Sequence, residues 1–133
     1  MSLQFTSAPG GELLEIATEA PVVTAAFLNQ LIDDIANYLD ERPRQYAKIL
    51  LIVTAPRADL TITESYQAWH QASRRGIWRT QFAYVMDGRP LSPLAQFIEV
   101  VAQNRQIYLR FFEHREPALE WLTVSAAEGG LVT

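Results

Sequence analysis

The stretch Lys48-Ile-Leu-Leu-Ile-Val-Thr54 decides the fold class of this 133-residue chain. All residues between Lys48 and Thr54 are apolar, and most of them are β-branched. A short apolar run without polar alternation is typical of a strand buried on both faces, as at the centre of an α/β sheet. Such a strand needs helices packed against it, and the flanking sequence supplies them.

The segment before this strand predicts an amphipathic helix. Thr24 is a suitable N-cap and Pro43 ends the pattern. Asp33 and Asp34 fall on the outer face and indicate a solvated surface. The inner face has helical spacing and consists of Phe27, Leu28, Leu31, Ile32, Ile35, Tyr38 and Leu39.

Similar signals predict the other elements. Thr61 and Glu64 form a capping-box pattern at the start of a helix that ends near Arg75-Gly76. Ser92-Pro93 supplies the cap and first turn of a third helix, with Leu94, Phe97, Ile98 and Val101 as its inner stripe, and Pro117 opens a short last helix. Strands are expected at 3–6, 12–17 (after a turn at 9–11), 81–86 and 106–112.

The predicted element order is β-β-α-β-α-β-α-β-α. Strands that alternate with amphipathic helices indicate a single-domain α/β sandwich, with a mixed but mostly parallel sheet of four or five strands and about four helices. The whole chain, 1–133, is expected to form this one domain, with its core at about 11–125.

The composition excludes several kinds of chemistry. With no cysteine and only His70 and His114, thiol catalysis, disulfides and histidine-rich zinc sites are not expected, and no cofactor is predicted. The chain is 49% hydrophobic and 20% charged, has no apolar run long enough to span a membrane, and shows no export leader. These features favour a cytoplasmic globular domain.

The charge is unevenly distributed along the chain. The net charge is −4, which argues against nucleic acid as a partner. Residues 74–115 nevertheless carry seven arginines against three acidic residues, and ten of the eleven basic residues are arginine. This bias is explained either by codon usage or by a surface that binds carboxylate or phosphate.

Three loops that follow predicted parallel strands define the candidate site. The carboxyl ends of parallel strands share one edge of a sheet, beside helix N-termini that favour anions. If the strands are neighbours, the candidate ligand-binding residues Arg57, Arg89, His114 and Arg115 converge there. The competing interpretation is that exposed loops collect charged residues because they are wet.

Aromatic residues gather around the second predicted helix and the strand after it. They are Tyr66, Trp69, Trp78, Phe82 and Tyr84. They form either part of the core or an apolar groove for a lipid-like ligand or a protein partner. A homodimer is compatible with the chain, but no sequence feature specifies one.

The C-terminal region resembles SpoIIAA-like proteins of the STAS superfamily. The resemblance lies in Tyr108-Leu-Arg-Phe-Phe112 followed by Glu116-Pro-Ala-Leu-Glu-Trp-Leu122, and in the predicted element order. It implies a small bacterial α/β sandwich that binds or regulates without catalysis. The function expected first is therefore recognition of a small anionic or amphipathic ligand, or of a protein partner.

Two alternative functions remain. Anti-sigma-factor antagonists of that superfamily carry a phosphorylated serine in Asp-Ser-x-Gly, whereas the corresponding stretch here, 58–65, lacks this motif. A phosphorylation switch would have to use Thr61, Thr63 or Ser65. The second alternative is a small enzyme in which His114 acts with Asp87 or Glu113.

Overall fold

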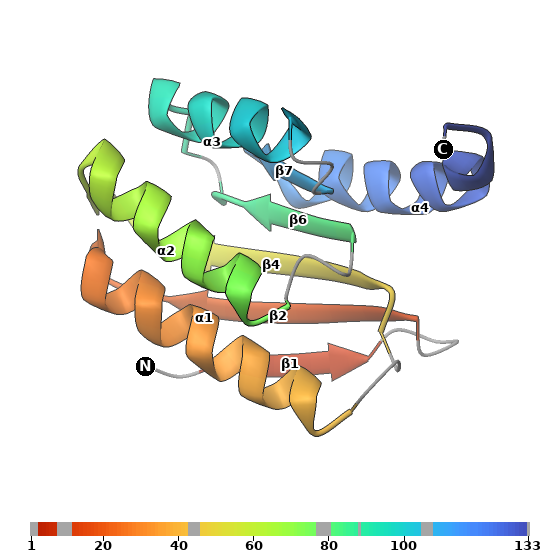
Figure 1. Cartoon of the computed structure of the whole chain (residues 1–133), viewed down its shortest axis with the longest axis horizontal. Coiled ribbons are helices and arrows are strands. Elements are labelled where there is room, and N and C mark those ends of the chain that lie inside the picture. The colour runs from red at the N-terminus through yellow and green to blue at the C-terminus, as the bar shows by residue number, and fades with distance from the viewer. Residues whose placement is uncertain are drawn as a thin grey trace.

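A computed structural model describes residues 3–7, 12–42, 46–76, 81–87, 89–104 and 108–132, with side-chain burial up to Thr123. Its main sheet has the strand order β1-β2-β4-β6-β7 (Figure 1). β1 is antiparallel to β2, and every other neighbouring pair is parallel. The predicted α/β class with a mostly parallel sheet is confirmed. The strands are β1 (Gln4–Ser7), β2 (Leu13–Glu19), β4 (Lys48–Thr54), β6 (Gln81–Val85) and β7 (Leu109–Phe112).

Four helices cover the two faces of this sheet unequally. Three of them pack on one face and enclose the larger core, whereas α4 packs on the other face with a smaller core (Figure 1). None of the described helices is long and apolar enough to cross a membrane. The helices are α1 (Ala25–Asp40), α2 (Ile62–Arg74), α3 (Pro93–Asn104) and α4 (Arg115–Val132).

The central strand occupies the residues predicted for it. Ile49 and Leu51 belong to the core under α1, α2 and α3, whereas Leu50 belongs to the core under α4, and all three are at most 1% exposed. Because successive side chains of a strand point to opposite faces, a strand covered on both faces needs apolar residues at every position. This requirement explains the unbroken apolar run.

The predicted starts of α1 and α2 are also confirmed. Thr24 Oγ1 accepts a hydrogen bond from Phe27 N at 3.1 Å, and the capping box of α2 joins Thr61 to Glu64 in both directions. Gly76 follows α2 with a φ of 79°, a left-handed conformation in which a side chain would be strained. These caps satisfy backbone groups that the helix itself leaves without partners.

The structure corrects the predicted set of strands and the predicted inner face of the third helix. The structure adds two short strands, β3 (Val23–Thr24) and β5 (Ala58–Asp59), which pair with each other outside the main sheet. Such two-residue strands have no hydrophobic period to reveal them. The predicted inner residue Phe97 is 46% exposed, because the smaller Ala95 and Ala102 face the core with Ile98.

The predictions for the last helix, the last strand and the turns compare with the structure as follows. α4 begins at Arg115, two residues before the predicted start at Pro117, and it is not short, since its backbone remains helical to Val132. β7 starts at Leu109 instead of residue 106, although residues 105–107 lie outside the described part of the chain. The predicted turn at 9–11, the helix stop at Pro43 and Trp78 also lie outside the described residues.

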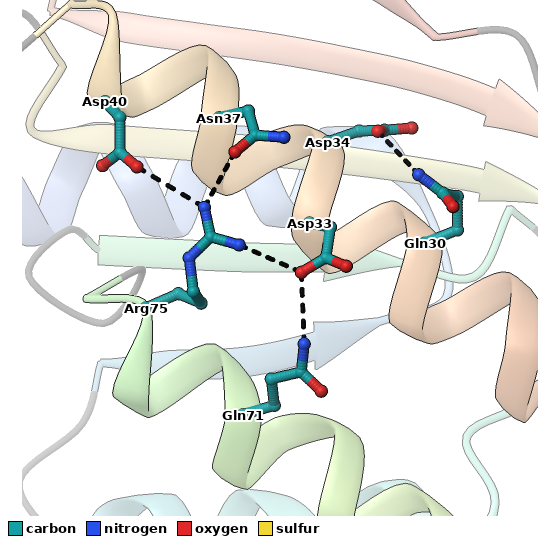
Figure 2. A network of polar contacts seen from close by, with 7 residues as sticks. All are labelled: Gln30, Asp33, Asp34, Asn37, Asp40, Gln71 and Arg75. Carbon is teal, nitrogen blue, oxygen red and sulfur yellow. Dashed lines mark hydrogen bonds and ion pairs between the residues drawn. The ribbon is translucent and has the colours of Figure 1, made fainter.

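A polar network joins the outer faces of α1 and α2 (Figure 2). Asp33 Oδ1 accepts hydrogen bonds from Gln71 Nε2 at 3.1 Å and from Arg75 Nη1 at 3.0 Å. Nη2 of Arg75 donates to Asn37 Oδ1 at 2.9 Å and to Asp40 Oδ2 at 3.4 Å. The interpretation of Asp33 as a merely solvated residue is therefore wrong, because its carboxylate links two helices.

Loss of this network has a modest expected effect. We expect Arg75→Ala to lower the free energy of unfolding by about 1 kcal/mol, because the network is partly exposed and screened by water. Urea denaturation measures the change. Arg74→Ala is the matched control, since Arg74 is exposed and absent from the network, and its effect should stay within about 0.5 kcal/mol. Equal losses in the two variants would contradict a specific role for Arg75.

Candidate functional site

A pocket opens between α2 and α3, beside the C-terminal end of β6. Its cavity volume is about 60 Å³, or about 430 Å³ when the open mouth is included. A volume of roughly 10–15 Å³ is enough for one water molecule, so this space accepts a small group. We call it the α2–α3 pocket; it is lined by Val23, Leu28, Ala58, Leu60, Ser65, Trp69, Tyr84, Met86, Arg89, Ser92, Leu94, Ala95, Ile98 and Phe111.

Apolar side chains form most of the pocket wall. Trp69 meets Tyr84 edge to face, with ring centroids 5.8 Å apart, and meets Phe111 in the same way at 6.0 Å. Leu94 and Ile98 come from α3 on the other side. Two of the aromatic residues singled out in the sequence therefore line a pocket and pack against the core at the same time.

Three polar side chains in this wall carry a group that has no hydrogen-bond partner among the described residues. Nε of Arg89 is buried without a hydrogen bond, and its guanidinium forms none of the ion pairs among the described residues. Ser65 and Tyr84 are each only 4% exposed, and neither hydroxyl forms a hydrogen bond within the described part of the chain. Buried polar groups are normally satisfied, so this concentration indicates a place where water or a ligand completes the structure.

Burial keeps the phenol of Tyr84 neutral. It raises the pKa of Tyr84 to about 12, and the nearby positive charge of Arg89 opposes this effect without overcoming it. A neutral phenol is a hydrogen-bond donor. The pocket therefore presents one cation and the hydroxyl groups of Ser65, Tyr84 and Ser92 in an apolar setting.

The loop after β6 places Arg89 at the pocket. Asp87 adopts a φ of 48°, and its Oδ2 accepts a hydrogen bond from Thr54 Oγ1 at 2.6 Å. The backbone N–H of Arg89 donates to the carbonyl of Met86 at 3.2 Å. At the far end of the loop, the N–H of Leu91 donates to Glu113 Oε1 at 3.3 Å. The loop is thus fixed on both sides of Arg89.

One of the four candidate ligand-binding residues lines the α2–α3 pocket. Arg89 lines it, whereas Arg57, His114 and Arg115 are exposed and do not. Arg115 instead makes two hydrogen bonds to Glu15, at 2.7 and 3.2 Å, and this pairing raises its pKa. The α2–α3 pocket therefore contains Arg89 alone of the four, and a carboxylate 100 residues earlier in the chain holds Arg115. The role of all four residues in ligand binding stays a prediction.

The three candidate phosphorylation sites differ in their surroundings. Thr63 is exposed at the start of α2. Thr61 is also exposed, but its hydroxyl oxygen accepts the N–H of Glu64 in the capping box. Ser65 is buried and faces the pocket.

The candidate enzymatic residues are not hydrogen-bonded to one another. Asp87 is bonded to Thr54, and Glu113 to the backbone of Leu91. Among the described residues, no hydrogen bond joins His114 to either carboxylate. The described part of the chain also holds no group of three or more acidic or histidine side chains suited to a metal ion.

Sequence reasoning singled out Tyr84 in an aromatic cluster and Ser65 as a phosphorylation candidate, but it did not predict that both line one pocket with Arg89. A signal for Tyr84 does exist, because it is a phenol in the otherwise apolar run from Phe82 to Met86. Tyr84 indicates a pocket only together with Arg89. Arg89 lies in a loop that is held by the hydrogen bond from Thr54, in β4, to Asp87.

Comparison with known proteins adds no family assignment. No protein-family model matches this chain, and no curated protein sequence matches it.

Proposed function

We propose that this protein is a non-enzymatic, STAS-like binding module that holds a small amphipathic anion in the α2–α3 pocket. The observation that carries the proposal is the Arg89 Nε, which has no hydrogen-bond partner among the described residues, in an apolar wall that also holds the hydroxyls of Ser65 and Tyr84. An anion with an apolar body satisfies both parts of this pocket at once. We place its action in the bacterial cytoplasm, following the sequence resemblance.

Chemistry favours binding over catalysis at this site. Catalysis of a hydrolysis or transfer reaction needs a nucleophile or a base oriented by another group. In the pocket, Ser65 and Ser92 are the serine hydroxyls that could act as nucleophiles, and no histidine or carboxylate that could activate them belongs to the lining residues. A phenol whose pKa is about 12 is also a poor base near neutral pH.

The phosphorylation switch remains a second candidate function, with Thr63 as its exposed residue near the pocket-facing helix start. Phosphopeptide mapping of residues 58–75 from host-grown cells tests it. Phosphate on Thr63 supports the switch, and complete absence of phosphate from these peptides removes its basis.

The binding function is tested with a panel of small amphipathic anions. We expect at least one member to raise the thermal unfolding temperature of the wild type, and Arg89→Leu to weaken its binding by roughly tenfold to a hundredfold, as expected for a lost charged hydrogen bond. Isothermal titration calorimetry measures the affinities.

The matched control is Arg74→Leu. This exposed arginine lies near the far end of α2, outside the α2–α3 pocket, and its loss removes the same net charge. The control should retain wild-type affinity. Equal weakening in both variants would show that general charge, and not the pocket, attracts the anions; no binding by any member would remove the proposal.

A further inference from the structure

We propose that the ligand of the α2–α3 pocket is a monocarboxylate on a compact apolar body, with its two oxygens held by Arg89, Ser65 and Tyr84. This inference rests on the proposed binding function and narrows it to one chemical class. It follows from the kinds of donor that line the pocket, the charge of the pocket and the character of its wall.

Arg89 supplies a planar cation with parallel N–H donors. This arrangement matches the two oxygens of a carboxylate, and such bidentate pairs are stronger than a single hydrogen bond. Nε of Arg89 is buried and has no hydrogen-bond partner among the described residues, so this N–H is left to donate to a ligand. A planar two-oxygen head group would supply that partner.

The hydroxyls of Ser65 and Tyr84 add two further donors. A carboxylate accepts about four hydrogen bonds, two at each oxygen. Two N–H groups of Arg89 and the two hydroxyls give the same number, and all three residues line one pocket. Ser92 also lines the pocket; its Oγ accepts the N–H of Ala95 at 3.1 Å, and its own proton remains a further donor.

The charge of the pocket favours a single negative charge. Arg89 is the cation among its lining residues, and no acidic residue belongs to that set. A monoanion is neutralised by this one arginine. A phosphate monoester carries nearly two negative charges near neutral pH, so part of its charge would enter the apolar pocket without compensation, at a cost in free energy.

The pocket wall requires an apolar body on the ligand. Trp69, Ile98 and Phe111 offer apolar contact area, and the limited cavity accepts a few carbon atoms before the ligand reaches the mouth. Acetate would lack this contact, and a long chain would have to leave through the mouth. A branched, aromatic or short straight-chain acid is the expected class.

Three six-carbon probes test the proposal by calorimetry: hexanoate, hexyl phosphate and 1-hexanol. They share the apolar body and differ in the head group. We expect the wild type to bind hexanoate about tenfold or more tightly than either of the others, since a charged hydrogen bond adds at least this factor. Preferential or equal binding of hexyl phosphate or 1-hexanol would overturn the carboxylate assignment.

Two conservative variants test the hydroxyls separately. Tyr84→Phe and Ser65→Ala each remove one donor with little change in volume, so both should fold, as circular dichroism verifies. We expect each to weaken hexanoate binding by about tenfold and 1-hexanol binding by less than about threefold. Unchanged hexanoate affinity in both variants would contradict the proposed head-group site.

The outcomes separate the inference from the function on which it rests. If none of the probes binds and the wider anion panel also fails, the binding function itself is wrong. If hexyl phosphate or another anion binds and Arg89→Leu abolishes this binding, the function stands and the carboxylate assignment fails. Hexanoate binding that Arg89→Leu leaves unchanged would contradict both.

Discussion

Phe82→Ala should lower the free energy of unfolding by about 3–5 kcal/mol, the largest stability effect expected for a single substitution in this chain. Phe82 is 1% exposed in β6, and its ring packs beneath Trp69 with a centroid distance of 6.5 Å. Truncation removes buried apolar surface and leaves a cavity that the sheet cannot close. Urea denaturation measures the loss.

Phe97→Ala is the matched control for this prediction. It removes the same atoms from a side chain that is 46% exposed on α3, so its effect should stay within about 1 kcal/mol. If the two phenylalanines gave equal losses, the assignment of Phe82 to the core would be contradicted.

The second large effect is a loss of stability at high pH through Tyr84. Burial raises the pKa of Tyr84 to about 12, so the folded protein keeps a proton that the unfolded chain, with a tyrosine pKa of about 10, releases earlier. The stabilisation is fully present below pH 10 and falls as the pH rises towards 12. The total loss is about 3 kcal/mol, with about half of it reached by pH 11.

Comparison with Tyr84→Phe isolates this contribution from other titrating groups. The free energy of unfolding is measured at several alkaline pH values in both proteins. We expect the free energy of unfolding to fall more steeply with pH in the wild type than in Tyr84→Phe. The variant therefore gains stability relative to the wild type as the pH rises. Parallel curves would show that the Tyr84 phenol is not buried as described.

Local sequence patterns predicted the parts of the fold that depend on local physics. The run from Lys48 to Thr54 identified the central strand, and Thr61 with Glu64 identified the start of α2, because burial on two faces and helix capping are determined within a few residues. By contrast, β3 and β5 form through a pairing across more than thirty residues, which no local period reveals.

The candidate pocket contains one of the four residues that the sequence suggested for a site, and its other lining residues were not predicted together. The expectation of a site near the C-terminal ends of the parallel strands located Arg89, which the pocket contains. It did not separate Arg89 from Arg115, because that distinction depends on whether a distant carboxylate lies opposite each guanidinium. Glu15 pairs with Arg115, whereas no carboxylate among the described residues pairs with Arg89.

The position of a bound anion tests the central claim most directly. In a crystal structure of the wild type grown with hexanoate, we expect the carboxylate within hydrogen-bond distance of the Arg89 guanidinium and the alkyl chain against Trp69 and Ile98. The same crystals of Arg89→Leu should show no ligand there. Hexanoate bound elsewhere on the protein, with the pocket of the wild type holding only water, would contradict the account.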